Sequence, residues 1–201
     1  GQHTINAKTG PMIQIWILRS DMTPIEAVKT GGDEAICGDC KLRGDHGKDR
    51  ACYVQWFRAP VNIFRSKHLE WTVRQFSDAA AGKQLRLGAY GDPAAMPWEV
   101  WDAVLSKAAG WTGYTHAWRG CAPRYQDFLM ASVDSASEYL EAKAEGWRTF
   151  RVRSESVPAD IPLTSSEIVC PHEADNDVKC AGCSLCRGAA RPAKSIVITA
   201  H

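Results

Sequence analysis

The feature that most constrains this chain is a group of four cysteines near its C-terminal end, in the pattern C-P-x8-C-x2-C-x2-C. The group comprises Cys170, Cys180, Cys183 and Cys186. Three cysteines spaced in this way converge on one centre when the backbone folds around it, and Cys170 can bring a fourth thiolate to the same place. We therefore expect the segment 170–188 to fold around a bound metal group.

The spacing of these cysteines favours an iron–sulfur cluster over a single metal ion. A C-x2-C-x2-C run with an additional Cys-Pro is typical of bacterial ferredoxins, although there the Cys-Pro comes last. Zinc sites usually use two separated C-x2-C or C-x2-C/H-x3-H pairs. We expect one [4Fe–4S] cluster here, with zinc as the alternative. Disulfides or free thiols are the third reading, and a bond between such close neighbours would be strained.

Composition argues against two broad classes of function. The 201 residues carry 24 Lys and Arg against 23 Asp and Glu, which leaves no basic stripe for nucleic acid. No apolar run approaches the roughly 20 residues that span a bilayer. Eight cysteines without a visible secretory signal predict metal ligands in a reducing compartment. We expect no nucleic-acid partner and no membrane contact.

A second group of cysteines, Cys37, Cys40 and Cys52, lies in a polar loop near 36–54. Three thiolates need a fourth ligand, or they leave one metal position open. His46 lies midway and gives C-x2-C-x5-H-x5-C, one residue longer on each side of the histidine than a zinc knuckle. Cys121 is the other candidate for a fourth ligand. The group predicts a second metal site, against the alternative of ordinary buried thiols and a solvated His46.

Apolar and β-branched runs alternate with segments of helical periodicity, which predicts an α/β fold with a mostly parallel sheet. Strands are expected over 12–18, 53–56, 85–90, 113–118, 128–133, 147–152, 167–169 and 195–200. Helices are expected after the Thr23-Pro24 cap, over 60–74 with a break near 67, over 97–108 and over 136–145, and residues 1–10 are expected to form a polar arm. A partial or full β/α barrel is the leading architecture, with an open doubly wound sheet as the alternative. The whole chain, 1–201, is expected to be a single domain.

Polar side chains follow several of the predicted strands. The candidates for catalysis are Asp92, His116, Arg119 and Asp134. In a parallel sheet they would share one edge with the cysteine loops and His201, and α/β proteins place their chemistry there. The plainer readings are a capping aspartate and a hydrogen-bonded core histidine. No phosphate-binding glycine loop is present.

An ordered series of motifs resembles a family of bacteriophage-encoded cysteine-rich proteins. The motifs are KTGPMIQIWIL, ICGDC…ACYV, LRLGAYGDPAAMP, GYTHAWR, LMASVDS, GWRTFRV, the C-terminal cysteine run and SIVITAH. The resemblance implies an iron–sulfur protein in the cytoplasm of the infected host cell, with a host or phage redox partner. It also implies a barrel-like fold similar to radical S-adenosylmethionine enzymes. The chain lacks their C-x3-C-x2-C motif, and its four cysteines at 170–186 would close the open iron position that those enzymes need.

Three functional hypotheses follow from these patterns. In the first, the cluster has an electron-transfer, sensing or structural role. In the second, the chain is a cluster-dependent redox or radical enzyme with a substrate pocket at the strand ends. In the third, it is a zinc-stabilised protein that binds a partner. The first needs only the cysteines and is the leading hypothesis.

Overall fold

The chain adopts an α/β fold, as expected, in a computed structural model that describes residues 2–66, 71–153 and 164–199. The strands are β1 (Gln2–Asn6), β2 (Gly10–Trp16), β3 (Gln84–Tyr90), β4 (Gly110–Thr112), β5 (Tyr114–Thr115), β6 (Met130–Val133), β7 (Thr149–Arg153), β8 (Glu167–Val169) and β9 (Ser195–Thr199). The α-helices are α1 (Pro24–Thr30), α2 (Glu34–Cys37), α3 (Ala59–Arg65), α4 (Val73–Ala80), α5 (Trp98–Leu105), α6 (Ala136–Ala144), α7 (Pro171–Ala174) and α8 (Cys180–Cys183). Short 3-10 turns are η1 (Lys41–Arg43), η2 (Pro93–Ala95), η3 (Ala117–Arg119), η4 (Pro123–Asp127) and η5 (Gly188–Ala190).

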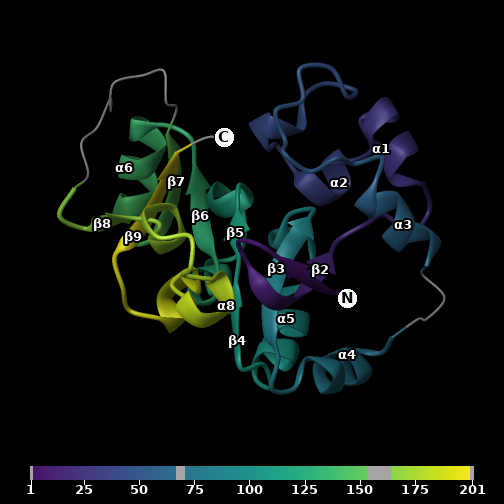
Figure 1. The fold of residues 1–201 in the computed structure, drawn as a ribbon. Helices are drawn as coiled ribbons and strands as arrows, with labels where there is room; N and C mark the ends of the chain where they lie inside the picture. The colour runs from purple at the N-terminus through teal and green to yellow at the C-terminus, as the bar shows by residue number, and fades with distance from the viewer. Residues whose placement is uncertain (1, 67–70, 154–163, 200–201) are drawn as a thin grey trace.

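The described strands form two sheets that follow one another along the chain (Figure 1). The first has the order β1-β2-β3-β4 and the second the order β5-β6-β7-β9-β8. All neighbours are parallel except the β1–β2 hairpin. Only Gly113 separates β4 from β5, so the two sheets are joined through a nearly continuous central strand.

Most strands pair in chain order within each sheet. β2, β3 and β4 do so in the first sheet and β5, β6 and β7 in the second, whereas β4 and β5 belong to different sheets. The order departs from this sequence only where β9 lies between β7 and β8. Within the described ranges, neither β1 nor β2 pairs with β8, so these strands do not close a barrel.

Helix boundaries follow the capping signals in the sequence. The Thr23 hydroxyl accepts a hydrogen bond from the Glu26 backbone N–H, and the Glu26 carboxylate accepts one from the Thr23 N–H, which completes a capping box at α1. Gly31 ends this helix with φ +75°, a conformation that favours glycine. Ser135 caps α6 through the Glu138 N–H. The cap at Thr23 was predicted from the sequence, and the structure confirms it.

Three local predictions were wrong. The expected arm at 1–10 contains β1, because pairing with β2 satisfies its backbone groups although its residues are mostly polar. The expected strand at 53–56 is absent, and Tyr53 is exposed with its ring against the Arg86 guanidinium. The expected strand at 113–118 stops at Thr115, because the chain turns into η3 there. The expected break near 67 falls in 67–70, outside the described residues, as does His201.

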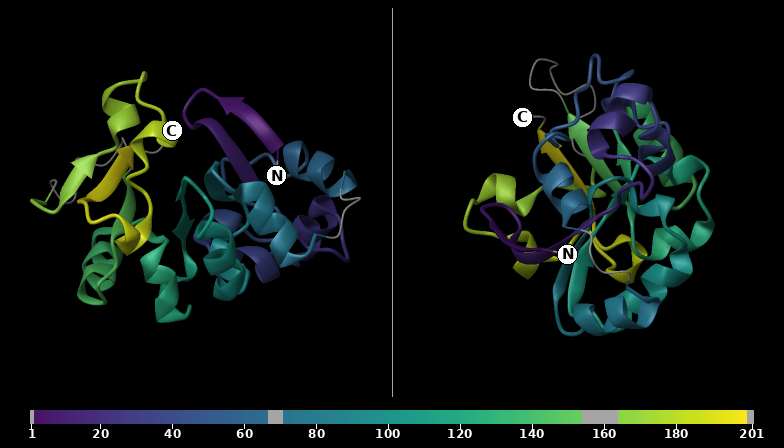
Figure 2. Two further views of the ribbon diagram at one scale, coloured as in Figure 1. Left: turned by 90° about the horizontal axis from the view of Figure 1, so that it is seen from below. Right: turned by 90° about the vertical axis from the view of Figure 1, so that its right-hand side faces the viewer.

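Two apolar cores lie within the fold. The larger one joins the first sheet and β6 to the helices and includes the fully buried Trp101 and Trp147. The smaller one contains Met130, Phe150 and Ile196 from the second sheet, together with two cysteines of the C-terminal run. The β1–β2 hairpin and the α7–α8 segment lie together on the side of the sheet away from α6 (Figure 2). The second core therefore places the cysteine run against one face of the second sheet.

Candidate functional site

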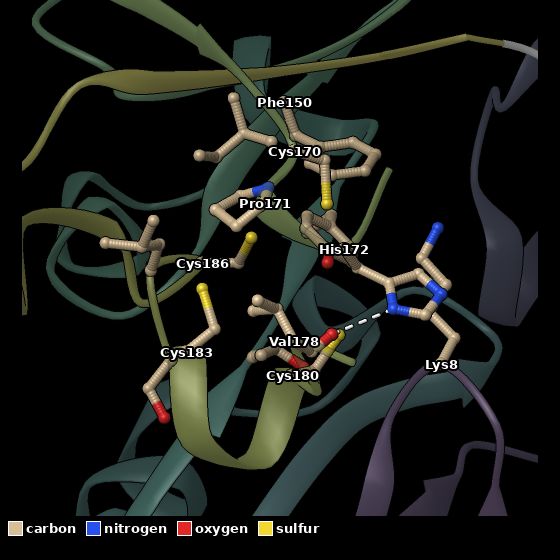
Figure 3. Close-up of a pocket in the computed structure, with 14 residues that line it drawn as sticks. Lys8, Phe150, Cys170, Pro171, His172, Val178, Cys180, Cys183 and Cys186 are labelled. Carbon is tan, nitrogen blue, oxygen red and sulfur yellow. Dashed lines mark hydrogen bonds between the residues drawn. The ribbon is translucent and has the colours of Figure 1, made fainter. Parts of the chain in front are cut away.

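All four cysteines of the C-terminal run line one pocket (Figure 3). Cys170 directly follows β8, Cys180 and Cys183 lie at the two ends of α8, and Cys186 follows in the next loop. Cys170 and Cys186 are buried, whereas Cys180 and Cys183 are partly exposed. Figure 3 shows the four side chains around a shared space, in the convergent arrangement that the spacing predicts.

Backbone hydrogen bonds fix the run to three different elements. The Cys170 N–H donates to the Val197 carbonyl in β9 (2.8 Å), and the Cys180 N–H donates to the Lys8 carbonyl in the β1–β2 turn (3.2 Å). The Gly113 N–H donates to the Cys186 carbonyl (3.0 Å). A Cβ at Gly113 would lie 2.5 Å from a Leu129 methyl group, so any side chain at this position would force Leu129 to move.

Arg148 holds the segment that follows the cysteines. Its Nη1 donates to the carbonyls of Leu185 (2.9 Å) and Gly188 (2.7 Å). Its Nε donates to Ala193 (2.8 Å) and its Nη2 to Lys194 (2.7 Å). One guanidinium beside β7 thus satisfies four carbonyls of a loop with little regular structure, and it also places a positive charge near Cys186.

Apolar side chains and cations surround the four thiols. Tyr114, Phe150 and Ile196 contribute apolar surface to the pocket, and Lys8 lies at its edge. Burial raises the pKa of Cys180, while the charges of Lys8 and Arg86 lower it. Such cations suit an anionic cluster, because thiolate ligands carry negative charge that must be balanced in a low-dielectric site.

Like that of Cys170, the Cys186 thiol is buried. Burial raises its pKa to about 12, against a lowering contribution from the Tyr114 hydroxyl. A thiol with such a pKa is protonated at neutral pH, whereas a metal-bound sulfur is a thiolate. Metal binding at this pocket would therefore release protons, and it would be linked to folding.

His172 is a pocket residue that the sequence reasoning missed. Its Nδ1 is 2.8 Å from the Val178 carbonyl, a contact that closes the loop between Cys170 and Cys180 (Figure 3). Its position two residues after Cys170 was the available signal. Lys8 carried no comparable signal, because only the hairpin brings it to the pocket.

A single zinc ion and a cluster hold their sulfur ligands at different separations. A tetrahedral zinc ion with Zn–S distances of about 2.3 Å holds its sulfurs roughly 3.8 Å apart. Within the described residues, no three His, Cys, Asp or Glu side chains are grouped as one bound ion requires. A cluster spreads its ligands more widely, because each thiolate binds a different iron.

The four catalytic candidates lie together in a different part of the fold. His116, Arg119 and Asp134 line a second pocket with Cys40, and Asp92 lies beneath it. The remaining lining residues are Asp39, Lys41, Trp118, Ser132 and Glu138. The expectation that these side chains share one edge with the 36–54 loop agrees with this pocket, whereas Cys170 belongs to the first pocket.

The Asp92 carboxylate holds the backbone of His116. One carboxylate oxygen of Asp92 accepts the Ala94 N–H (2.9 Å), which caps η2, and the other accepts the His116 N–H (2.8 Å). Burial raises the pKa of Asp92, although these N–H groups lower it in part. Asp92 thus has the contacts of the capping aspartate that was the plainer reading.

Arg119 and Asp134 flank the imidazole of His116. Asp134 Oδ2 lies 3.6 Å from His116 Nε2. Burial alone would lower the pKa of His116. The interactions with Asp134 and Cys40 outweigh this effect and raise the pKa to about 10. Arg119 stacks on Trp118 and pairs with Glu141 at 2.7 Å, so its charge is largely compensated.

The second cysteine group gathers in the loop after α2. The charges of both Cys40 and Cys52 act on Cys37, whose pKa burial raises to about 12. His46 is exposed and lies 3.1 Å from the Lys29 carbonyl, and Cys121 faces the Trp118 carbonyl at 3.9 Å. The two pockets have no lining residue in common, so the structure separates the two cysteine groups.

The comparisons with known proteins add no relative. The sequence matches no family model and no curated protein, and the fold matches no solved structure. No helix within the described ranges is long and apolar enough to cross a membrane. The resemblance to bacteriophage proteins and to the radical S-adenosylmethionine fold therefore stays a prediction, and any functional conclusion has to come from the two pockets.

Proposed function

We propose that this chain is an iron–sulfur protein that holds one [4Fe–4S] cluster on Cys170, Cys180, Cys183 and Cys186. The observation that carries the proposal is that these four thiols line one pocket although Cys170 comes from a strand end and the others from α8 and its loop. Four thiolates are the usual ligand set of such a cluster.

The surroundings suit an electron-transfer, sensing or structural role. Cys170 and Cys186 are buried against the second sheet, and Cys180 and Cys183 are partly exposed. One side of the cluster would therefore lie near the surface, where electrons can be exchanged with a partner. The other side would link β8, β9 and the β1–β2 hairpin, which gives the cluster a structural contribution as well.

The enzymatic alternative is less well supported. Radical chemistry on S-adenosylmethionine needs an iron without a protein ligand, and four cysteines around one pocket leave none. The second pocket contains Asp134, His116 and Arg119, but Arg119 already pairs with Glu141.

The test is a comparison of two cysteine variants purified without oxygen. Cys183→Ala should lose most of the iron and the broad absorbance near roughly 400 nm that thiolate-bound clusters show. Cys121→Ala is the matched control, because Cys121 lies outside both cysteine groups, and it should keep both signals. Equal iron content in the two variants would contradict the proposal.

A further inference from the structure

The loop after α2 brings three cysteines near one another, since the charges of Cys40 and Cys52 both act on Cys37. The Cys40 N–H donates to the Cys37 carbonyl (3.3 Å), which forms a tight turn between the two cysteines. The Cys52 N–H donates to the Leu42 carbonyl (2.9 Å) and brings the third cysteine back beside that turn. Loops with a C-x2-C turn and a returning cysteine are common in structural zinc sites.

This loop is held in place by a buried carboxylate. Asp33, with 2% of its side chain exposed, accepts hydrogen bonds from Arg43 Nη1 (3.1 Å) and Arg50 Nη1 (2.9 Å). Arg50 Nη1 also donates to the Arg43 carbonyl (2.7 Å). Because both arginines lie between Cys40 and Cys52, the ion pairs set the path of the loop independently of any bound group.

A histidine from the sheet meets this loop. His116 follows β5, and its backbone is fixed by the Asp92 carboxylate. Its Nε2 is buried and makes no hydrogen bond, although Asp134 Oδ2 lies 3.6 Å away, within ion-pair distance. A buried nitrogen without a hydrogen bond is costly. His116 and Cys40 line the same pocket, so a metal ion bound by Cys40 would replace Asp134 as the partner of this nitrogen and displace its proton.

The two fourth ligands suggested by the sequence are engaged elsewhere. The His46 side chain is 54% exposed and contacts the Lys29 carbonyl and Asp45. The Cys121 thiol faces the Trp118 carbonyl, and the charges that act on it come from Asp92 and Glu145. Neither residue lines the pocket that contains Cys40.

We propose that His116 completes a Cys3His centre with Cys37, Cys40 and Cys52, and that this centre binds one zinc ion. Cys3His is an established donor set of tetrahedral structural zinc. The described side chains are not yet grouped at single-ion distances, so zinc draws the thiolates inward by side-chain rotation and displaces their protons. The ion would fasten the loop after α2 to the end of β5.

The test is zinc binding by the full-length chain, prepared without oxygen, with zinc measured by elemental analysis and the site probed with Co²⁺. We expect about one zinc per chain, and a Co²⁺ form with thiolate charge-transfer absorbance. His116→Ala should weaken zinc binding on the order of 100-fold, and His46→Ala should leave it unchanged. His116→Cys should restore zinc binding and strengthen the thiolate–Co²⁺ bands, which a purely structural role of His116 would not produce.

The outcomes separate this site from the cluster proposed above. Cys183→Ala should lose iron and keep zinc, whereas Cys40→Ser should lose zinc and keep iron. Zinc affinity in His116→Ala equal to that of the wild-type chain would overturn the assignment of His116. Iron and sulfide that disappear in Cys40→Ser, in place of zinc, would overturn the assignment of the metal.

Discussion

Replacing Arg148 by alanine is expected to destabilise the segment that carries the C-terminal cysteines. The guanidinium donates four hydrogen bonds of 2.7–2.9 Å to the carbonyls of Leu185, Gly188, Ala193 and Lys194. A hydrogen bond to a charged group contributes about 1.5–3 kcal/mol. A simple sum would reach the entire stability of a typical domain, about 5–15 kcal/mol, so it overestimates the effect.

The structure indicates how far that sum must be reduced. Arg148 is only partly buried, and the Lys194 contact is exposed, so water can replace part of what is lost. We therefore expect a loss of about 3–4 kcal/mol in the free energy of unfolding, at the upper end of single substitutions. With a urea dependence of about 2 kcal/mol/M, the unfolding midpoint should fall by roughly 1.5–2 M.

The assay is urea unfolding under one anaerobic protocol, because metal loss would otherwise add to the difference. Arg124→Ala is the matched control: Arg124 makes three ion-pair hydrogen bonds to Asp102 and Asp127, but 48% of its side chain is exposed. Exposed pairs contribute about 0–1 kcal/mol. If Arg148→Ala costs no more than Arg124→Ala, the described role of Arg148 is wrong.

Three further predictions concern the ion pairs, the remaining cysteine and nucleic acid. Arg151 and Glu167 form a buried bidentate pair across β9, so Glu167→Gln should cost about 3–5 kcal/mol in urea unfolding, whereas Glu141→Gln at the exposed Arg119 pair should cost under about 1 kcal/mol. Burial raises the pKa of Cys121 to about 11, so iodoacetamide at pH 8 should alkylate it far more slowly than an unfolded cysteine of pKa about 8.5, and equal rates would refute this. Anisotropy titrations with DNA and RNA at moderate salt should show no sub-micromolar affinity, because the basic residues are dispersed among acids; tight, salt-sensitive binding would contradict that expectation.

Local signals in the sequence predicted the elements that local interactions determine. The Thr23–Glu26 capping box lies within four residues, and its geometry follows from backbone rules. β3 alternates between buried and partly exposed residues, and β9 is a β-branched apolar run, so both patterns predict strands directly. The convergence of Cys180, Cys183 and Cys186 follows from their close spacing.

Features that depend on distant partners were not predictable in this way. β1 has a mostly polar sequence, and only its pairing with β2 makes it a strand. The partners of Arg148 are backbone carbonyls, so the pattern of side chains along the sequence does not indicate them. α7 and α8 span four residues each, too short for helical periodicity. His116 meets Cys40 only because the chain returns through the sheet, so sequence reasoning chose the nearer His46 as a candidate ligand.

The most direct test of the central claim is the iron, acid-labile sulfide and zinc content of wild-type protein that has never been exposed to oxygen. The four thiols around the first pocket predict about four iron and four sulfide per chain. The brown colour and broad absorbance of the cluster should disappear together with the iron when the sample is exposed to a chelator and oxygen. Stoichiometric zinc with no sulfide in this pocket would contradict the account.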